Sequence, residues 1–361
     1  MANQPLRIGV VGVGFGATVH VPAFQSEGWE VRAISSRRED RVKKAAADLG
    51  VTDAMTDWRA LVARDDLDAV AVSTPPAAHL EIVSAALKAG KHVLCEKPFA
   101  LSAAEAASMA ALAKERGLTA MVAHEFRHAP QRAQVRELLN QGAIGTPQVV
   151  SAELLLGRAA PDAPPPVTWG SRAAEGGGFL GALGSHYIDG LRHWFGDVAS
   201  VSGVLKTLRP ERLDRDSGQV VHADTDDTFS FTLTFTNGVV ATMVASSAVA
   251  PSQGVRITVA GSDGMLVATQ RGANPEPDGV VLLGKSTDRA LAPVEMPARF
   301  RPFEDDRDPR LVSFRLLVRD FEAGIREGRS PSPNFEDGLK CQQVLDAVRE
   351  SSRTGRTVTI A

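Results

Sequence analysis

The chain has 361 residues, of which 43% are hydrophobic, and its formal net charge is −3. The composition is typical of soluble globular proteins, the length predicts two domains, and the scattered basic residues argue against a nucleic-acid-binding surface. No apolar run reaches the roughly 18–20 residues that a membrane-spanning helix needs.

The first residues and the cysteines indicate the compartment. Residues 1–7 reach the first predicted strand without the charged and apolar segments of a secretory signal. The two cysteines, Cys95 and Cys341, lie far apart and outside any Cys-x-x-Cys pattern, which favours reduced thiols. We therefore predict a cytoplasmic protein. The histidines and acidic residues show no metal-ligand spacing, so we predict no metal site.

Strand and helix patterns alternate with short connections over residues 1–124. The predicted strands, which are rich in apolar residues, are Leu6–Val11, Val31–Ser35, Ala69–Val72, His92–Cys95 and Thr119–Ala123. Two of the intervening helices are expected to begin at the capping residues Asp57 and Ser102. This alternation predicts an α/β protein whose N-terminal domain, residues 1–124, is a doubly wound parallel sheet of the Rossmann type.

The pattern changes after residue 124. A helix over Pro130–Gln141 is followed mainly by strands, predicted at Val149–Leu156, Val198–Thr207, Asp227–Thr236, Val239–Ala245, Val255–Val259 and Gly264–Thr269. Asn237-Gly238 and Gly261–Gly264 are turn sequences that join neighbouring strands in antiparallel pairs. Amphipathic helices are predicted at Leu311–Glu327 and Glu336–Glu350. Residues 125–361 are thus expected to form a C-terminal α+β domain with a large, mostly antiparallel sheet.

The turn after the first predicted strand is rich in glycine and opens a helix. Backbone N–H groups at such a helix N-terminus bind the pyrophosphate of a dinucleotide. Ala17 takes the third position of the fingerprint, where a small residue allows close packing of helix on sheet. We predict cofactor contacts from Gly12, Gly14, Phe15, Gly16 and Ala17.

The residues after the second predicted strand indicate which dinucleotide binds. An acidic residue here would hold the ribose diol of NAD, but this chain has Ser36 followed by Arg37 and Arg38. A hydroxyl with two guanidinium groups accommodates a 2′-phosphate, so we predict NADP as the preferred cofactor and NAD as the other. The alternative is that the two arginines only begin a solvated helix.

Glu96-Lys97-Pro98 ends the strand at His92–Cys95 and therefore lies at the carboxyl edge of the sheet, where ligands of open α/β sheets bind. Oxidation of an alcohol needs a base for the hydroxyl proton and positive charge near the developing alkoxide. Lys97 is the predicted catalytic group, and Glu96 is a candidate partner of the ribose or nicotinamide. The alternative for Lys97 is a surface lysine at a strand end.

Four stretches carry a resemblance to a known family: the Gly12–Gly16 turn, Ser73–Pro76 with His79, Ala89–Pro98, and Gly176–Gly178 followed by His186–Asp189. In these the chain resembles the Gfo/Idh/MocA family of glucose-fructose oxidoreductase and inositol dehydrogenase. The resemblance implies reversible hydride transfer between nicotinamide and a carbinol carbon of a sugar, cyclitol or related compound. It also implies a cis Lys97–Pro98 bond and a homodimer or homotetramer.

The same resemblance makes His186 an acid/base candidate. Family members usually carry an aspartate four residues earlier, where this chain has Ala182. His186 therefore lacks the usual orienting carboxylate, and a substrate hydrogen bond or a structural role remain alternatives. Tyr187 and Asp189 are further substrate candidates, and Asp189 lies at i+3 from His186 on the same helix face. A packing role is the alternative for Tyr187.

The resemblance also implies further contacts to the cofactor. They are expected from Thr74, Pro75, Pro76, His79 and Arg127. Additional substrate contacts are expected from His124, which follows the last Rossmann strand, and from Trp169 and Arg172. The last two lie in a long loop, Gly157–Gly178, that we interpret as a lid. The alternatives are a plain surface insertion, with Trp169 as a hydrophobic anchor and Arg172 as a solvated arginine. Glu125 also follows the last Rossmann strand, and His20 is expected to have a packing role.

The sequence thus predicts a cytoplasmic NAD(P)-dependent oxidoreductase of a polyol- or sugar-like substrate, without nucleic-acid or membrane partners. Two alternatives remain: a redox-neutral, NAD-using glycosidase-like enzyme, and a non-catalytic nucleotide- or sugar-binding sensor, which the loss of the acid at Ala182 keeps open. Strands from Asp227 to Ala245 alternate apolar residues with Thr and Ser, so one sheet face is expected to form the homo-oligomer.

Overall fold

The computed structural model describes residues 4–157, 164–274 and 279–360. These residues divide into two compact units. Unit 1 runs to Glu125 and also contains Asp305–Leu339, whereas unit 2 contains Phe126–Glu304 and the residues from Lys340 onward. The division predicted from the sequence has a single boundary after residue 124 and gives 305–339 to the second domain. The contacts give that segment to unit 1, because helix α8 (Leu311–Glu327) packs on its core.

The described part of unit 1 contains a six-stranded parallel sheet with the order β3-β2-β1-β4-β5-β6. Its strands are β1 (Arg7–Val11), β2 (Glu30–Ser35), β3 (Asp53–Met55), β4 (Ala69–Val72), β5 (His92–Cys95) and β6 (Ala120–Val122). The order reverses between β1 and β4, which makes this the switch point of a doubly wound sheet. The predicted Rossmann sheet is confirmed, although β3 was not predicted.

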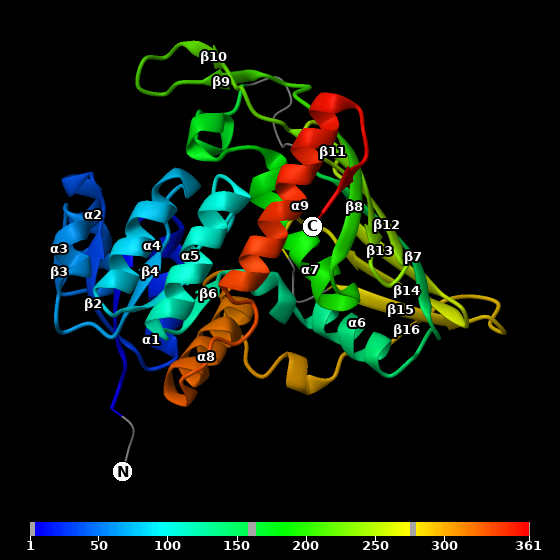
Figure 1. The fold of residues 1–361 in the computed structure, drawn as a ribbon, viewed down its shortest axis with the longest axis horizontal. Helices are drawn as coiled ribbons and strands as arrows, with labels where there is room; N and C mark the ends of the chain where they lie inside the picture. The colour runs from blue at the N-terminus through cyan, green and yellow to red at the C-terminus, as the bar shows by residue number, and fades with distance from the viewer. Residues whose placement is uncertain (1–3, 158–163, 275–278, 361) are drawn as a thin grey trace. The chain divides into compact units, whose positions relative to one another are not determined.

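Helices cover both faces of this sheet (Figure 1). One face packs against α1 (Val21–Ser26), α2 (Glu39–Leu49) and α8, and the other against α3 (Trp58–Val62), α4 (His79–Lys88) and α5 (Ala103–Arg116). The side chains of Asp57 and Ser102 accept hydrogen bonds from the N–H groups of Arg59 and Glu105, so both predicted helix caps are confirmed. Because apolar residues alternate between two covered faces, β4 is buried throughout.

The described part of unit 2 contains a nine-stranded sheet with the order β16-β15-β14-β13-β7-β12-β11-β8-β17. Its strands are β7 (Pro147–Leu155), β8 (Val198–Lys206), β11 (Thr228–Phe235), β12 (Val240–Ser246), β13 (Gly254–Gly261), β14 (Gly264–Gln270), β15 (Val280–Lys285), β16 (Ala292–Pro293) and β17 (Val358–Thr359). Among the described strands of this sheet, only β7 and β12 pair in parallel, so the predicted mostly antiparallel sheet is confirmed. β15, β16, β17 and the small pair β9 (Glu211–Leu213) and β10 (Val220–His222) were not predicted.

The two faces of the large sheet differ in chemistry. Phe229, Phe231, Leu233 and Phe235 of β11 are buried in a core shared with α7 (Ser185–Phe195) and with α9 (Phe335–Thr354) from Cys341 onward. Figure 1 shows α7 and α9 against this face. The opposite face carries the Thr and Ser residues of β11, which are exposed or half-buried. The predicted alternation of β11 is therefore confirmed.

Candidate active site

The glycine turn of unit 1 joins β1 to a short helical turn, η1 (Gly16–His20). Gly12 has φ of 118°, and a Cβ atom added there would lie 2.2 Å from the carbonyl oxygen of Ser73, so only glycine fits. A Cβ atom at Gly14 would meet nothing within 4 Å. The turn therefore packs tightly on the end of β4 and leaves open space at Gly14, as a close approach of ligand to backbone requires.

Two buried hydroxyl groups lie beside this turn, at the carboxyl end of β4. The Oγ of Ser73 and the Oγ1 of Thr74 have no hydrogen-bond partner among the described residues. Buried polar atoms normally have a partner, so these hydroxyls fit a polar ligand at this edge. The set of residues is thus suited to a dinucleotide. Thr74 was among the predicted cofactor residues, whereas Ser73 was missed because nothing in the sequence marks it as buried.

Ser36 follows β2 and receives a 3.4 Å hydrogen bond from the N–H of Arg38. The guanidinium of Arg38 pairs with Asp40, with N–O distances of 3.3 and 3.0 Å. Arg37 is exposed and has no ion pair with a described residue. Of the two predicted phosphate ligands, Arg37 is consequently the one whose guanidinium is not already engaged.

His79 is fully buried at the start of α4, directly after the turn η2 (Pro76–Ala78) that contains Pro76. Its Nε2 lies 2.9 Å from the carbonyl oxygen of Thr74 and its Nδ1 lies 3.1 Å from that of Phe99. Burial lowers the pKa of His79, so the ring is neutral and donates to one carbonyl at a time. His79, predicted as a cofactor ligand, thus stabilises the loop at Thr74 and Pro75 from its buried side.

Lys97 is half-buried after the carboxyl end of β5 and is joined to Pro98 by a cis peptide bond, as the resemblance implied. Its N–H donates to Glu96 Oε2 over 3.1 Å. The other carboxylate oxygen of Glu96 lies 2.8 Å from Nε2 of the fully buried His20. Burial alone would raise the pKa of Glu96, but the hydrogen bond and charge of His20 and the charge of Lys97 outweigh it, so the net shift is downward.

His20 therefore does more than pack. The centroid of its ring lies 4.4 Å from that of Phe314, which belongs to α8, and 5.6 Å from that of Phe15. The three rings form an aromatic cluster. The guanidinium of Arg310, just before α8, lies 4.8 Å from the Phe15 ring. Neither Arg310 nor Phe314 was predicted, because nothing in the sequence relates α8 to the glycine turn.

His124 and Glu125 follow β6 and are both buried. The N–H of Ala123 donates to the carbonyl oxygen of Cys95 over 2.7 Å, so the segment that leads to Glu125 begins beside Glu96. Burial, followed by the charge of Glu96, raises the pKa of Glu125 to about 8. At neutral pH this carboxyl group is therefore largely protonated.

Unit 2 contains a buried ion pair between two of the predicted residues. Arg127, in the turn η3 (Glu125–His128), donates from Nε and Nη2 to the two carboxylate oxygens of Asp189 in α7, both over 2.6 Å. Arg127 was predicted to bind the cofactor and Asp189 to bind the substrate, but in this bidentate geometry they bind each other. Burial and the charge of Arg127 lower the pKa of the neighbouring His128 to about 4, so that ring is neutral.

His186 lies at the second position of α7 and is buried. Its ring stacks on that of Phe126, with centroids 3.7 Å apart and planes at 9°. Ala182 lies one turn earlier, in η6 (Leu180–Gly184), and supplies no carboxylate. Stacking on Phe126 thus fixes the plane of the His186 ring, a role that the resemblance assigned to an aspartate at the position of Ala182. Phe126 was not predicted.

Tyr187 is buried beneath Arg132 of helix α6 (Pro130–Asn140), whose guanidinium lies 4.3 Å from the tyrosine ring. Burial raises the pKa of Tyr187, so the phenol stays protonated. Arg132 was not predicted. This arrangement makes Tyr187 part of the α6–α7 packing, which is the alternative that the sequence left open.

The long loop is described from residue 164 onward, and the predicted lid residues 158–163 lie outside the described part. Trp169 is half-buried at the start of the turn η4 (Trp169–Ser171). Arg172 is exposed and pairs with Glu175 over 3.1 Å. The carbonyl oxygen of Gly170 accepts bonds from Gly178 N and Thr225 Oγ1, both over 2.9 Å, so this part of the loop is bonded to its surroundings.

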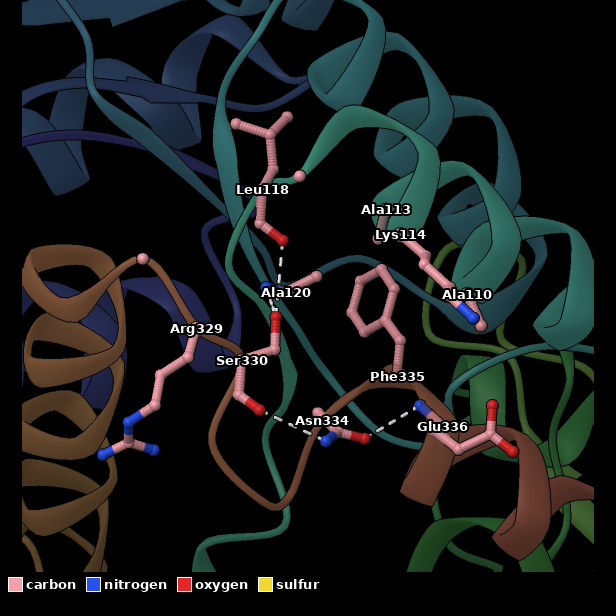
Figure 2. Close-up of a pocket in the computed structure, with 12 residues that line it drawn as sticks. Ala110, Ala113, Lys114, Leu118, Ala120, Arg329, Ser330, Asn334, Phe335 and Glu336 are labelled. Carbon is pink, nitrogen blue, oxygen red and sulfur yellow. Dashed lines mark hydrogen bonds between the residues drawn. The ribbon is translucent and has the colours of Figure 1, made fainter.

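A pocket of about 280 Å³ in unit 1 lies elsewhere, beside the amino end of β6 and the end of α5 (Figure 2). Two of its polar side chains are already engaged, since Ser330 Oγ accepts from Ala120 N and Asn334 Nδ2 donates to Ser330 O. In a parallel sheet the amino ends of the strands form the edge opposite the glycine turn. This pocket is therefore separate from the candidate active site.

The described residues contain neither a membrane-spanning helix nor a cluster of metal ligands. None of the helices in residues 4–157, 164–274 and 279–360 is long and apolar enough to cross a membrane. Within the same ranges, no group of three or more His, Cys, Asp or Glu side chains is arranged to hold a metal ion.

Comparison with known proteins identifies related chains. Residues 6–124 match the family model "Oxidoreductase family, NAD-binding Rossmann fold", and residues 133–267 match "GFO/IDH/MocA C-terminal domain". A dTDP-3,4-didehydro-2,6-dideoxy-alpha-D-glucose 3-reductase from Actinomadura kijaniata is 32% identical, over 97% of this chain and 96% of the relative. Levoglucosan dehydrogenase from Pseudarthrobacter phenanthrenivorans is 27% identical, over 97% and 96% of the two chains.

Solved structures give the same result. An oxidoreductase domain protein from Kribbella flavida has a TM-score of 0.89 and 32% identity, over 99% of this chain and 100% of that chain. Levoglucosan dehydrogenase in complex with NADH and levoglucosan also has a TM-score of 0.89, with 26% identity over 99% and 100% of the two chains.

Proposed function

Because this chain belongs to the Gfo/Idh/MocA oxidoreductase family, we propose that it is an NADP-preferring dehydrogenase or reductase. Its substrate is a sugar, cyclitol or related cyclic alcohol, or the corresponding ketone. One observation carries the proposal: Lys97 follows β5 at the sheet edge where Gly12 and the unpartnered hydroxyls of Ser73 and Thr74 also lie. A bound nicotinamide nucleotide supplies the hydride acceptor or donor.

The preference for NADP is inferred from the end of β2. Ser36 has no charge to repel a 2′-phosphate, and the exposed Arg37 can bind one. Arg38 contributes less because it already pairs with Asp40. Among the relatives, a D-xylose 1-dehydrogenase (NADP(+)) from Haloferax volcanii is 28% identical, which is compatible with this cofactor choice.

Lys97 and His186 are the proposed catalytic residues. Lys97 stabilises negative charge on the substrate oxygen and moves its proton, and Glu96 holds the lysine backbone through the 3.1 Å bond to Lys97 N. His186 is proposed to assist as acid/base, with its ring plane held by Phe126 in the absence of an acidic side chain at Ala182. The substrate class is supported by relatives named for sugars, levoglucosan and xylose among them.

A homo-oligomer is proposed through the exposed face of the nine-stranded sheet. Ser202, Thr232, Thr242, Ser151 and Thr258 lie side by side on this face, one on each of five neighbouring strands. Val149, Val204, Val244, Met265 and Val280 flank this row and are 36–52% exposed. The same face carries Glu153 and Arg256, which lie opposite each other on β7 and β13, and its other side chains named here are small and uncharged. Such a broad exposed face fits a second copy of itself.

The test is a screen of cyclic polyols, sugars and cyclitols with NADP, followed at the absorbance band of reduced nicotinamide. Net reduction of cofactor with at least one substrate supports the proposal. Conversion of a sugar without net cofactor turnover would favour a glycosidase-like enzyme. Binding of sugar and nucleotide without conversion would favour a sensor, for which the alanine at position 182 is the argument.

A further inference from the structure

Glu125 is a buried carboxyl group for which the proposed mechanism has no use. Its side chain lies in unit 1 with only 2% of the residue exposed. It follows β6, the neighbour of β5, and the bond from Ala123 N to Cys95 O joins the ends of these two strands over 2.7 Å. The segments that carry Glu125 and Lys97 therefore leave the same sheet edge side by side.

Three charged groups, Glu96, Lys97 and Arg310, act on this carboxyl. Glu96 raises its pKa, whereas the positive charges of Lys97 and Arg310 lower it. His20 acts through Glu96, whose Oε1 lies 2.8 Å from the histidine Nε2. Burial outweighs the two cations, and the pKa of Glu125 is about 8. One more positive charge at this edge would favour loss of its proton at neutral pH.

An oxidised nicotinamide ring would bring such a charge. A dinucleotide with its pyrophosphate at the glycine turn after β1 and its adenosine ribose at the end of β2 would have its nicotinamide on the other side of β1, where β4 and β5 lie in the strand order. The oxidised ring is a cation and the reduced ring is neutral. The charge at this edge therefore changes by one unit whenever hydride is transferred.

We propose that Glu125 stores the proton that alcohol oxidation releases and exchanges it in step with the charge of the nicotinamide. This rests on the proposed function. Oxidation breaks the C–H and O–H bonds of the alcohol and forms a C=O bond, and the hydride passes to the nicotinamide ring. The hydroxyl proton passes to Lys97 as Lys97 gives a proton to the Glu125 carboxylate, so the protonation state of Lys97 is the same before and after the step. Reduction of a ketone runs the steps in reverse.

Calorimetry of cofactor binding tests the proposal without substrate. NADP and NADPH are each titrated at pH 7 in buffers of different ionisation enthalpy, which gives the protons released per binding event. Both carry the same 2′-phosphate, so its protonation cancels in the comparison. We expect NADP to release about one proton more than NADPH, because only the oxidised ring makes Glu125 ionise.

Three variants test whether the extra proton released on NADP binding comes from Glu125. Glu125→Gln should abolish the difference between NADP and NADPH, and Glu125→Asp, which keeps an ionisable group, should retain it. Glu115→Gln, at an exposed glutamate of α5, is the matched control and should behave as the unmodified protein. A difference that persists in Glu125→Gln would overturn the proposal, as would equal proton release by NADP and NADPH in the unmodified protein.

A second measurement needs no variant and covers the case in which Glu125→Gln does not fold. The ratio of the Kd of NADP to that of NADPH should fall with rising pH, by at most about tenfold per unit, and become constant above about pH 8. A ratio independent of pH would contradict the role of Glu125. Failure of both nucleotides to bind would overturn the proposed function, and with it this inference.

Discussion

Arg127 and Asp189 form a buried, bidentate ion pair in which Nε and Nη2 of the arginine each lie 2.6 Å from a carboxylate oxygen. The side chains are 4% and 1% exposed, so neither charge is solvated by water. Removing one partner of such a pair leaves an uncompensated buried charge. The pair therefore holds η3 to α7 within unit 2, directly beside Phe126 and His186.

We predict that Asp189→Asn destabilises the protein by about 3–5 kcal/mol in urea unfolding, since the amide cannot neutralise Arg127. Asp40→Asn, which removes a carboxylate from the exposed pair with Arg38, is the control and should change stability little. Equal effects of the two substitutions would contradict the structural role of the buried pair.

Ser36→Asp should reverse the cofactor preference. The introduced carboxylate can bind the ribose diol of NAD and repels a 2′-phosphate. Calorimetry should show tighter NADPH than NADH binding before the substitution and the opposite order after it. Arg37→Ala should weaken NADPH alone, whereas Arg41→Ala, an exposed arginine further along α2, should change neither. Tighter NADH binding by the unmodified protein would refute the preference for NADP.

Lys97→Ala should lower turnover by roughly 100-fold or more while leaving cofactor affinity largely unchanged, because the lysine acts on the reacting oxygen. Lys114→Ala, which removes an exposed lysine from the pocket of Figure 2, is the matched control. Steady-state kinetics on the same substrate compares the two. Near-normal turnover in Lys97→Ala would require a different mechanism.

The stability of the cofactor-free protein should depend on Glu125 and pH. The pKa of Glu125 is about 8 in the folded protein and about 4.5 when the side chain is fully solvated, so the stabilising contribution is complete below about pH 4.5 and is lost as pH rises to 8. Relative to Glu125→Gln, the unmodified protein should lose at most about 1.4 kcal/mol per pH unit across this window. Urea unfolding of both proteins between pH 5 and 9 measures the difference, which should be constant above 8.

Thr242→Arg should disrupt the proposed oligomer, since it puts a charged, bulky side chain in the middle of the exposed sheet face. Thr52→Arg introduces the same change at an exposed position of unit 1 and is the control. Light scattering should give a multiple of 38.3 kDa for the unmodified protein and the control, and a smaller mass for Thr242→Arg. A single-chain mass for the unmodified protein would exclude the interface.

Local patterns explain most of what could be predicted. The buried strand at Ala69–Val72, the cap at Ser102 and the helix at Leu311–Glu327 each depend on neighbouring residues, and the structure has all three. Strand β15 was not predicted, although Val280–Leu283 is apolar and directly follows the turn sequence Pro277-Asp278-Gly279. Resemblance to a family supplied the functional candidates.

Contacts between residues far apart in the chain could not be predicted from the sequence. His20 and Glu96 are 76 residues apart, and their 2.8 Å contact depends on how η1 packs against the end of β5. The assignment of α8 to unit 1 likewise depends on which core its apolar stripe meets, because amphipathicity alone does not specify a partner. Burial sets the state of Glu125, and one sequence does not reveal burial at a polar residue.

Transfer of label tests the central claim most directly. A substrate found in the screen is prepared with deuterium at the carbinol carbon, and the reduced cofactor is isolated after turnover and examined by mass spectrometry. We predict one deuterium in the nicotinamide ring for each ketone formed, since hydride passes directly from carbon to cofactor. Product that forms while the reduced cofactor carries no deuterium, or with no net reduction of cofactor, would contradict the assignment of this protein as a dehydrogenase.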